Sequence, residues 1–180
     1  MAALTPMMQQ YVEVKEKYKD CILFYRIGDF YEMFFEDAIT ASKVLEITLT
    51  GKDCGQEERA PMCGVPYHAC DVYLNKLIEN GFKVAICEQV EDPKLAKGLV
   101  KRDVIRVVTP GTNMSQAILD ENTNNYLMSI YLSKDMSGVS VVDITTGEFK
   151  TCRISSIAKL ADEINKYSPS EIIGNDDFLN

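Results

Sequence analysis

The chain has 180 residues and a 46% hydrophobic content, which fits one domain, or one and a half, with a real apolar core. Its net charge is −8, with −3 in residues 1–110 and −5 in residues 111–180, and this acidic balance argues against a module that binds nucleic acid strongly by itself. The sequence contains no run of 18 apolar residues and no signal-peptide pattern, so we expect neither a membrane span nor secretion.

The first predicted element is a helix that begins at Thr5-Pro6, where a hydroxyl cap precedes a proline in the first turn. Apolar residues then recur at helical spacing and form one stripe: Met7, Tyr11, Val14 and Tyr18. After this helix, residues 21–27 predict a buried strand, and Gly28-Asp29 predicts a bend.

The segment from Phe24 to Phe35 contains six aromatic residues. If the chain after the bend is extended, its side chains alternate between two faces, so Phe30, Glu32 and Phe34 share one face. The other face then holds Tyr31, Met33 and Phe35. One interpretation is that Phe30 and Phe34 belong to the core. Glu32 then lies at its rim, because an unpaired buried charge is costly.

Helices and strands continue to alternate along the chain up to residue 112. The patterns predict a helix over 36–45, a strand over 47–50, an exposed loop or hairpin tip over 51–59, an irregular link between Pro61 and Pro66, a helix over 69–79, a strand over 83–90, a loop over 91–103 and a strand over 104–109. Asn80-Gly81 ends the second of these helices, since glycine favours the backbone conformation after a helix.

Two of these loops carry basic residues that could contact a phosphate backbone. Lys52 and Arg59 lie in the first loop, where neighbouring Asp and Glu residues are alternative partners. The second loop is the most basic stretch of the chain and contributes Lys94, Lys97, Lys101 and Arg102. A basic run is usually a solvated face, so both interpretations stay open.

The six cysteines show no tightly paired spacing. Cys21 and Cys87 lie in apolar, strand-like runs, where a reduced thiol behaves as a small hydrophobic residue. We therefore expect a reducing, cytoplasmic location. Four residues of zinc-ligating type lie within a short stretch: Cys54, Cys63, His68 and Cys70. Their spacing is irregular and lacks a Cys-x-x-Cys pair, so we expect loop and helix-start residues and no metal site.

The chain after residue 112 has a different pattern. It predicts a linker with a short helix over 113–124, strands over 126–132, 139–144 and 148–154, a helix that Ser155 or Ser156 caps and Ser168-Pro169 ends, and a parallel strand over 171–174. The three strands follow one another through short turns and form a β-meander.

The residue patterns of catalysis are missing from these 180 residues. The sequence has no phosphate-binding G-x-x-x-x-G-K-[ST] loop, and His68 is its only histidine. A metal-dependent nuclease that uses Asp29, Glu32 and Asp143 is one alternative, but single acids do not make a two-metal site. Another alternative is an interaction module in which residues 124–180 bind a partner protein. We expect no catalytic residues.

Five blocks of the sequence, in the same order over residues 5–112, resemble the MutS family of DNA mismatch-recognition ATPases: Thr5–Tyr11, Phe24–Phe34, Met62–His68, Val84–Gln89 and Val107–Thr112. The resemblance implies an α/β fold. A mixed β-sheet flanked by helices forms a mismatch-recognition domain over 1–112, and a linker covers 113–124. The first half of a ribonuclease H-like α/β connector domain then covers 125–180, so the chain resembles the N-terminal part of a longer protein.

The resemblance also implies a site and its partners. Phe30 and Glu32 match the family's Phe-x-Glu pair, in which the ring enters the minor groove as a wedge and the carboxylate hydrogen-bonds the displaced base. The implied partners are mismatched duplex DNA, a second copy of the parent protein in a homodimer, and a MutL-type protein. ATP and magnesium belong to the ATPase domain of the parent, so the resemblance implies no cofactor here and a DNA-binding segment rather than an enzyme.

Overall fold

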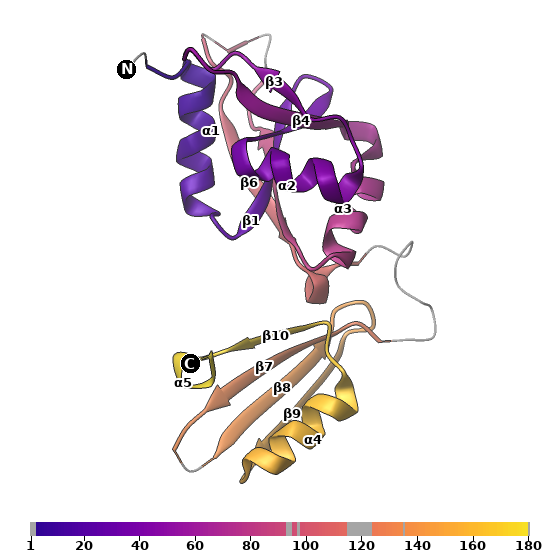
Figure 1. Cartoon of the computed structure of the whole chain (residues 1–180). Helices are drawn as coiled ribbons and strands as arrows, with labels where there is room; N and C mark the ends of the chain where they lie inside the picture. Colours follow the sequence, from indigo (N-terminus) through magenta and orange to yellow (C-terminus); the bar gives the residue numbers. More distant parts are fainter. Residues whose placement is uncertain (1–2, 93–94, 97, 115–123, 135, 180) are drawn as a thin grey trace. The chain divides into compact units, whose positions relative to one another are not determined.

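The computed structural model describes residues 3–92, 95–96, 98–114, 124–134 and 136–179. The chain divides into two compact units, Met1–Val108 and Thr109–Asn180 (Figure 1). Each unit combines a mixed sheet with helices, which confirms the predicted α/β fold class. None of the helices in the described part is long and apolar enough to cross a membrane.

The first unit contains one six-stranded sheet in the order β3-β4-β2-β1-β5-β6. Its elements are α1 (Pro6–Lys17), β1 (Cys21–Ile27), β2 (Phe30–Phe34), α2 (Phe35–Leu45), β3 (Thr50–Lys52), β4 (Ala60–Pro66), the 3-10 turn η1 (Tyr67–Ala69), α3 (Cys70–Glu79), β5 (Lys83–Gln89) and β6 (Arg102–Val108). Strand β1 pairs parallel to β5 and antiparallel to β2, so the sheet is mixed.

Helices cover both faces of this sheet (Figure 1). One core cluster joins Met33 of β2 to Ala41 of α2 and Leu77 of α3. The other joins Phe34 of β2 to Tyr11 of α1. Neighbouring residues of β2 therefore enter opposite layers, as the two-residue alternation predicts.

The start of α1 follows the sequence prediction. The hydroxyl of Thr5 accepts a hydrogen bond from the backbone N–H of Met8 at 3.4 Å, and Pro6 occupies the first turn. Tyr11, from the predicted stripe, is buried in the core, and Met8 is buried beside it. A local capping signal and a helical period were therefore enough to place this element.

Two predictions between residues 47 and 66 are wrong. The strand expected over 47–50 lies instead at Thr50–Lys52, because Ile47 completes the end of α2 and donates its backbone N–H to the Ser42 carbonyl at 3.1 Å. The stretch between Pro61 and Pro66 is a strand, not an irregular link. Both prolines lie near the ends of β4, where missing N–H donors interrupt the ladder least.

The loop expected over 91–103 is also shorter than predicted. Strand β6 begins at Arg102, which pairs with Gln89 of β5, so the ladder extends two residues further than the apolar pattern indicated. The helix and strand that precede this loop lie close to their expected positions, since α3 ends at Glu79 and β5 begins at Lys83.

The second unit contains a four-stranded sheet in the order β10-β7-β8-β9. Its elements are η2 (Pro110–Thr112), β7 (Tyr126–Leu132), β8 (Ser137–Asp143), β9 (Glu148–Ile154), α4 (Ile157–Tyr167), β10 (Glu171–Gly174) and α5 (Asp176–Leu179). The meander and the parallel pairing of β10 with β7 confirm the sequence predictions, whereas α5 was not predicted. Ser156, one of the two expected caps, accepts a hydrogen bond from the Lys159 N–H.

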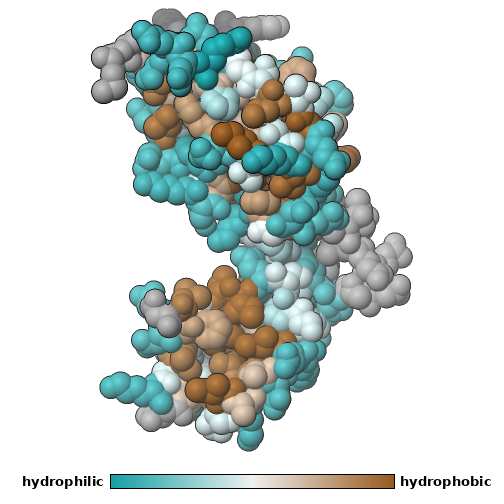
Figure 2. Space-filling model, viewed as in Figure 1, coloured by the Kyte–Doolittle hydropathy of each residue, from teal (hydrophilic) through white to brown (hydrophobic). Residues whose placement is uncertain are grey.

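One face of this second sheet packs against α4. Met128 and Val141 are buried there together with Leu160 of the helix. The opposite face carries large exposed side chains, among them Tyr131 and Phe149, each 65% exposed. In Figure 2, the visible surface of the second unit carries a broad apolar area, whereas apolar residues on the first unit are interspersed with hydrophilic ones.

Candidate functional site

The candidate site lies at the end of the β1–β2 hairpin. Ile27 pairs with Phe30, so the two strands are joined by the two residues Gly28 and Asp29. Gly28 has a φ of 55°, a left-handed conformation that glycine adopts without a steric penalty. The turn therefore places Phe30 at the first position of β2, where its side chain is 48% exposed.

The side chains of β2 alternate as the sequence predicts over Phe30–Phe34. Tyr31 and Met33 are buried in the layer of α2 and α3, and Phe34 is buried in the layer of α1. Phe34 is thus a core residue and Phe30 is not, which corrects the interpretation that both rings are core. Phe35 was expected beside Tyr31, but it packs with Phe34 because it begins α2 with a φ of 53°.

Glu32 carries the only carboxylate of β2, and it has a cationic partner. Its Oε2 lies 2.5 Å from Nζ of Lys52 on β3. The side chain of Glu32 is 14% exposed and that of Lys52 is 29% exposed, so the pair is largely withdrawn from water. Lys52 also lies 5.7 Å from the centre of the Phe34 ring. The lysine therefore spans from its strand over a buried ring to the carboxylate.

Gly64 of β4 makes room beside Glu32. It is the direct partner of Glu32 in the β2–β4 ladder. A Cβ at this position would lie 3.3 Å from the Tyr31 carbonyl oxygen and 3.5 Å from Cγ of Glu32. The missing side chain therefore leaves the face of β4 open where the Glu32 side chain lies.

Arg26 holds the hairpin end in place, and the sequence patterns did not identify this residue. Its Nε donates to the Gly28 carbonyl at 2.5 Å, and its guanidinium pairs with Glu88 at 3.4 Å. The Tyr31 hydroxyl also donates to Glu88. Burial, followed by this hydrogen bond, raises the pKa of Tyr31. An arginine at the end of an apolar strand is the signal that could have revealed the network, because a buried guanidinium requires partners.

Tyr67 is a second exposed aromatic residue at this end of the sheet. Its backbone N–H donates to the Asp29 carbonyl at 2.9 Å, and its neighbour Pro66 pairs with Phe30. The ring is 43% exposed and has the Arg26 guanidinium 3.8 Å from its centre. The hairpin turn is therefore fixed both from β4 and from the arginine, so Phe30 projects from a braced support.

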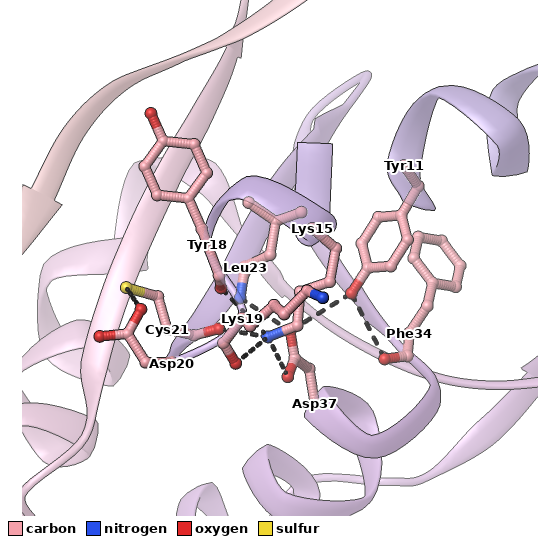
Figure 3. Close-up of polar contacts among 9 residues, drawn as sticks. All are labelled: Tyr11, Lys15, Tyr18, Lys19, Asp20, Cys21, Leu23, Phe34 and Asp37. Carbon is pink, nitrogen blue, oxygen red and sulfur yellow. Dashed lines mark hydrogen bonds and ion pairs between the residues drawn. The ribbon is translucent and has the colours of Figure 1, made fainter. Parts of the chain in front are cut away.

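A polar cluster inside the unit ties the hairpin to the helices on both sides (Figure 3). Asp37, in the first turn of α2, accepts from the Leu23 N–H at 3.0 Å and from the Tyr11 hydroxyl at 3.3 Å. Lys15 of α1 lies 2.9 Å from the same carboxylate and donates to the Cys21 carbonyl. Burial and the negative charge of Asp37 raise the pKa of Tyr11, so its hydroxyl stays a donor.

The other predicted basic residues are placed unevenly. Arg59 and Lys101 are exposed, whereas Lys94 and Lys97 lie outside the described residues. Arg102 is a strand residue whose guanidinium donates to the carbonyls of Arg26 and Val100 and to the Gln10 side chain. The Arg102 guanidinium therefore makes its hydrogen bonds inside the unit, whereas an exposed loop cation would be open to a phosphate.

The acids of the nuclease alternative do not form a metal site. Asp143 is fully buried in the second unit and accepts hydrogen bonds from Thr145, Thr146 and Asn125. The bonds from Thr145 and Thr146 close the turn between β8 and β9, and the bond from Asn125 ties this turn to the start of β7, which is a structural role. Among the described residues, no group of three or more His, Cys, Asp or Glu side chains is arranged to hold a metal ion, including the cysteines near His68.

Comparison with known proteins gives matches along the whole chain. Residues 5–117 match the family model described as MutS domain I, and residues 125–180 match that of MutS domain II. The chain is 68% identical over 179 residues to the DNA mismatch repair protein MutS of Lachnoclostridium phytofermentans, covering 99% of this chain and 19% of that protein. It is 68% identical over 182 residues to the MutS of Acetivibrio thermocellus, with 99% and 21% covered. The chain therefore spans about a fifth of the length of these relatives.

Proposed function

Because the chain belongs to the MutS family, whose named relatives are DNA mismatch repair proteins, we propose that its first unit recognises mispaired or unpaired bases in duplex DNA. Phe30 acts as a wedge in the minor groove, and Glu32 hydrogen-bonds the displaced base. The observation that carries this proposal is the position of Phe30, which is an exposed ring at a hairpin end, whereas Tyr31 and Phe34 on the same strand are buried.

The wedge works because base steps differ in how easily they separate. Inserting an apolar ring between two base steps costs a few kcal/mol of stacking, and this cost is smallest where a base is already mispaired or unpaired. Phe30 therefore responds to a weak stack rather than to a base sequence. The ring must also resist being pushed back, and its strand is hydrogen-bonded to β1 on one side and β4 on the other.

Glu32 adds a test of the base edge. An ionised carboxylate can only accept hydrogen bonds, and phosphates on both sides of the groove repel it. A displaced base that offers a donor compensates for this repulsion, whereas an intact base pair gives little in return. Glu32 therefore disfavours matched DNA, and we expect Glu32→Ala or Glu32→Gln to bring matched and mismatched affinities closer together.

The negative net charge of this chain limits how tightly it can bind DNA by itself. The first 110 residues carry a net −3, because 17 Asp and Glu residues outnumber 14 Lys and Arg residues. Most phosphate contacts would come from other parts of a longer protein, which would also supply the ATPase domain with its ATP and magnesium. A homodimer of that protein and a MutL-type partner complete the proposal, and no cofactor is assigned to these residues.

A titration tests recognition by the chain directly. Isotopically labelled protein is mixed at low salt with a duplex that carries one unpaired thymine, and backbone amide shifts are followed, because phosphate contacts weaken steeply as salt rises. A matched duplex of the same flanking sequence is the control. We expect shifts in residues 28–35 and in residues 51–59 that are larger with the unpaired thymine. Equal shifts with both duplexes would contradict the proposal.

Phe30→Ala tests the wedge in a full-length MutS that contains this segment. We expect the preference for the unpaired thymine to fall by about tenfold or more, since the unstacking that it exploits involves a few kcal/mol. Phe149→Ala is the matched control, because this ring is also exposed but lies in the second unit. A preference that survives Phe30→Ala would refute the wedge.

A further inference from the structure

We propose that Lys52 determines specificity by acting through Glu32. In this proposal the lysine neutralises the carboxylate when no base edge bonds to it, and thereby sets how strongly Glu32 opposes matched DNA. The inference rests on the proposed function of Phe30 and Glu32. It gives Lys52 a role different from the two that the sequence left open, a phosphate contact and a pairing with the neighbouring acids of its loop.

The ladder brings the two side chains to one face of the sheet. Lys52 pairs with Ala60, and Glu32 pairs with Gly64, so both oppose residues of β4 that are four positions apart. An even separation along a strand puts their side chains on the same face. The contact of 2.5 Å joins the ends of the two side chains across β4, where Gly64 has no side chain to separate them.

Burial distinguishes this pair from an incidental surface pair. Glu32 is 14% exposed, whereas Asp20 in the Lys83–Asp20 pair is 69% exposed and Glu46 in the Lys76–Glu46 pair is 81% exposed. Exposed pairs of that kind contribute little because water and salt screen them. A carboxylate that is mostly withdrawn from water depends more on its cation, since burying an unpaired charge is unfavourable.

The contact with Lys52 uses one of the two oxygens of the Glu32 carboxylate. Lys52 contacts Oε2, and a carboxylate has a second oxygen that can accept a hydrogen bond at the same time. At a displaced base, that oxygen has a donor and the charge is shared between the base edge and the lysine. At a matched pair there is no donor, so Lys52 alone offsets the repulsion between Glu32 and the phosphates.

Removing the lysine therefore affects the two kinds of DNA unequally. Without Lys52, Glu32 repels matched DNA at full strength, whereas a displaced base still compensates for part of the charge. We expect Lys52→Met to lower matched-duplex affinity about three- to fivefold more than affinity for the unpaired thymine, the size typical of a partly exposed ion pair. In an E32Q background this difference should disappear, because the charge that Lys52 offsets is gone.

The experiment compares five variants of a full-length MutS that contains this segment: K52M, K52R, E32Q, K52M/E32Q and K76M. Each is titrated with matched and unpaired-thymine duplexes at one salt concentration. K52R keeps the cation, so the ratio of unpaired-thymine affinity to matched-duplex affinity should stay within about twofold of the wild-type ratio. K76M makes the same chemical change in an exposed pair with Glu46 and should leave the ratio unchanged.

Two results would overturn the inference. One is that K52M lowers the affinities for both duplexes equally, with or without E32Q, as the loss of a phosphate contact would. Such a loss would also reduce the slope of log affinity against log salt concentration by about one. The other is that K52M lowers the ratio of unpaired-thymine affinity to matched-duplex affinity. Phe30→Ala separates this failure from that of the proposed function. If F30A abolishes the preference while K52M acts equally on both duplexes, only the role of Lys52 is wrong.

Discussion

Phe30 is exposed in a segment where four of the other aromatic rings, those of Phe24, Tyr25, Tyr31 and Phe34, are buried. Its position follows from the hairpin turn, which ends one residue before it and leaves it beyond the two covering layers. A ring that is only half buried contributes less to folding than a fully buried one, since its stabilising contribution comes from burial. If Phe30 acts as the proposed wedge, Phe30→Ala should affect DNA binding more than stability.

Asp143 shows the opposite case, a carboxylate that serves the fold alone. Burial by itself would raise the pKa of Asp143, but hydrogen bonds from Thr145, Thr146 and Asn125 together hold it below its ordinary value. A group with a lowered pKa stabilises the folded state above its unfolded pKa, and that stabilisation is lost as the pH falls through the folded pKa.

We therefore expect the second unit to lose stability as the pH falls below about 4, the ordinary range for an aspartate. Asp143→Asn should lower the melting temperature at pH 7 and flatten this acid dependence, because an amide does not titrate. Thermal unfolding from pH 7 to pH 3 measures both effects. Asp162→Asn, at an exposed position, serves as the control and should keep the wild-type profile. A wild-type acid dependence in the Asp143 variant would contradict the assignment.

At the scale of elements, the hairpin depends on its anchoring to α1 and α2. Asp37 receives hydrogen bonds from β1 and α1 and an ion pair from Lys15, so three elements meet at one buried carboxylate. The described residues contain no buried side-chain polar atom without a partner. This agrees with the general rule that buried polar groups are hydrogen-bonded.

Asp37→Ala should destabilise the first unit by about 2–4 kcal/mol, because it leaves the buried Leu23 N–H without its acceptor and removes the carboxylate that pairs with the Lys15 ammonium. Chemical denaturation followed by circular dichroism measures the change. Asp20→Ala removes a carboxylate from an exposed pair with Lys83, and it should cost less than about 1 kcal/mol. Equal losses in the two variants would show that the cluster does not anchor the hairpin.

At the scale of the whole molecule, the two units have separate cores. The two clusters of the first unit contain only residues before Thr109, and the cluster of the second contains only residues from Tyr126 onward. A segment that has its own core can fold by itself. The candidate site lies wholly within the first unit.

Residues 1–108 produced alone should therefore keep the amide spectrum that they have in the 180-residue chain, including the signals of the β1–β2 hairpin. Overlaying the two spectra measures this directly. Small shifts confined to residues near the cut at Val108 agree with independent folding. Loss of dispersed signals throughout the segment would show that the first unit requires the second.

Much of the fold and part of the site could be predicted from local patterns. The cap at Thr5, the alternation over Phe30–Phe34 and the strand after α4 depend on residues close in sequence, and the structure confirms them. The core interpretation did not predict that Phe30 is exposed, because an apolar pattern does not show where the helices that cover the sheet end. Strand β4 was missed because its two prolines resemble loop residues.

Periodicity, caps and five ordered blocks are properties of neighbouring residues, so local patterns were enough to identify an α/β chain of the MutS family. Local patterns do not show which side chains meet in the folded chain. Lys52 reaches Glu32, and Arg26 reaches Tyr67, across strands that are distant along the chain. Such contacts depend on strand order and register, and these are settled by packing the sheet between its helices rather than by any local pattern.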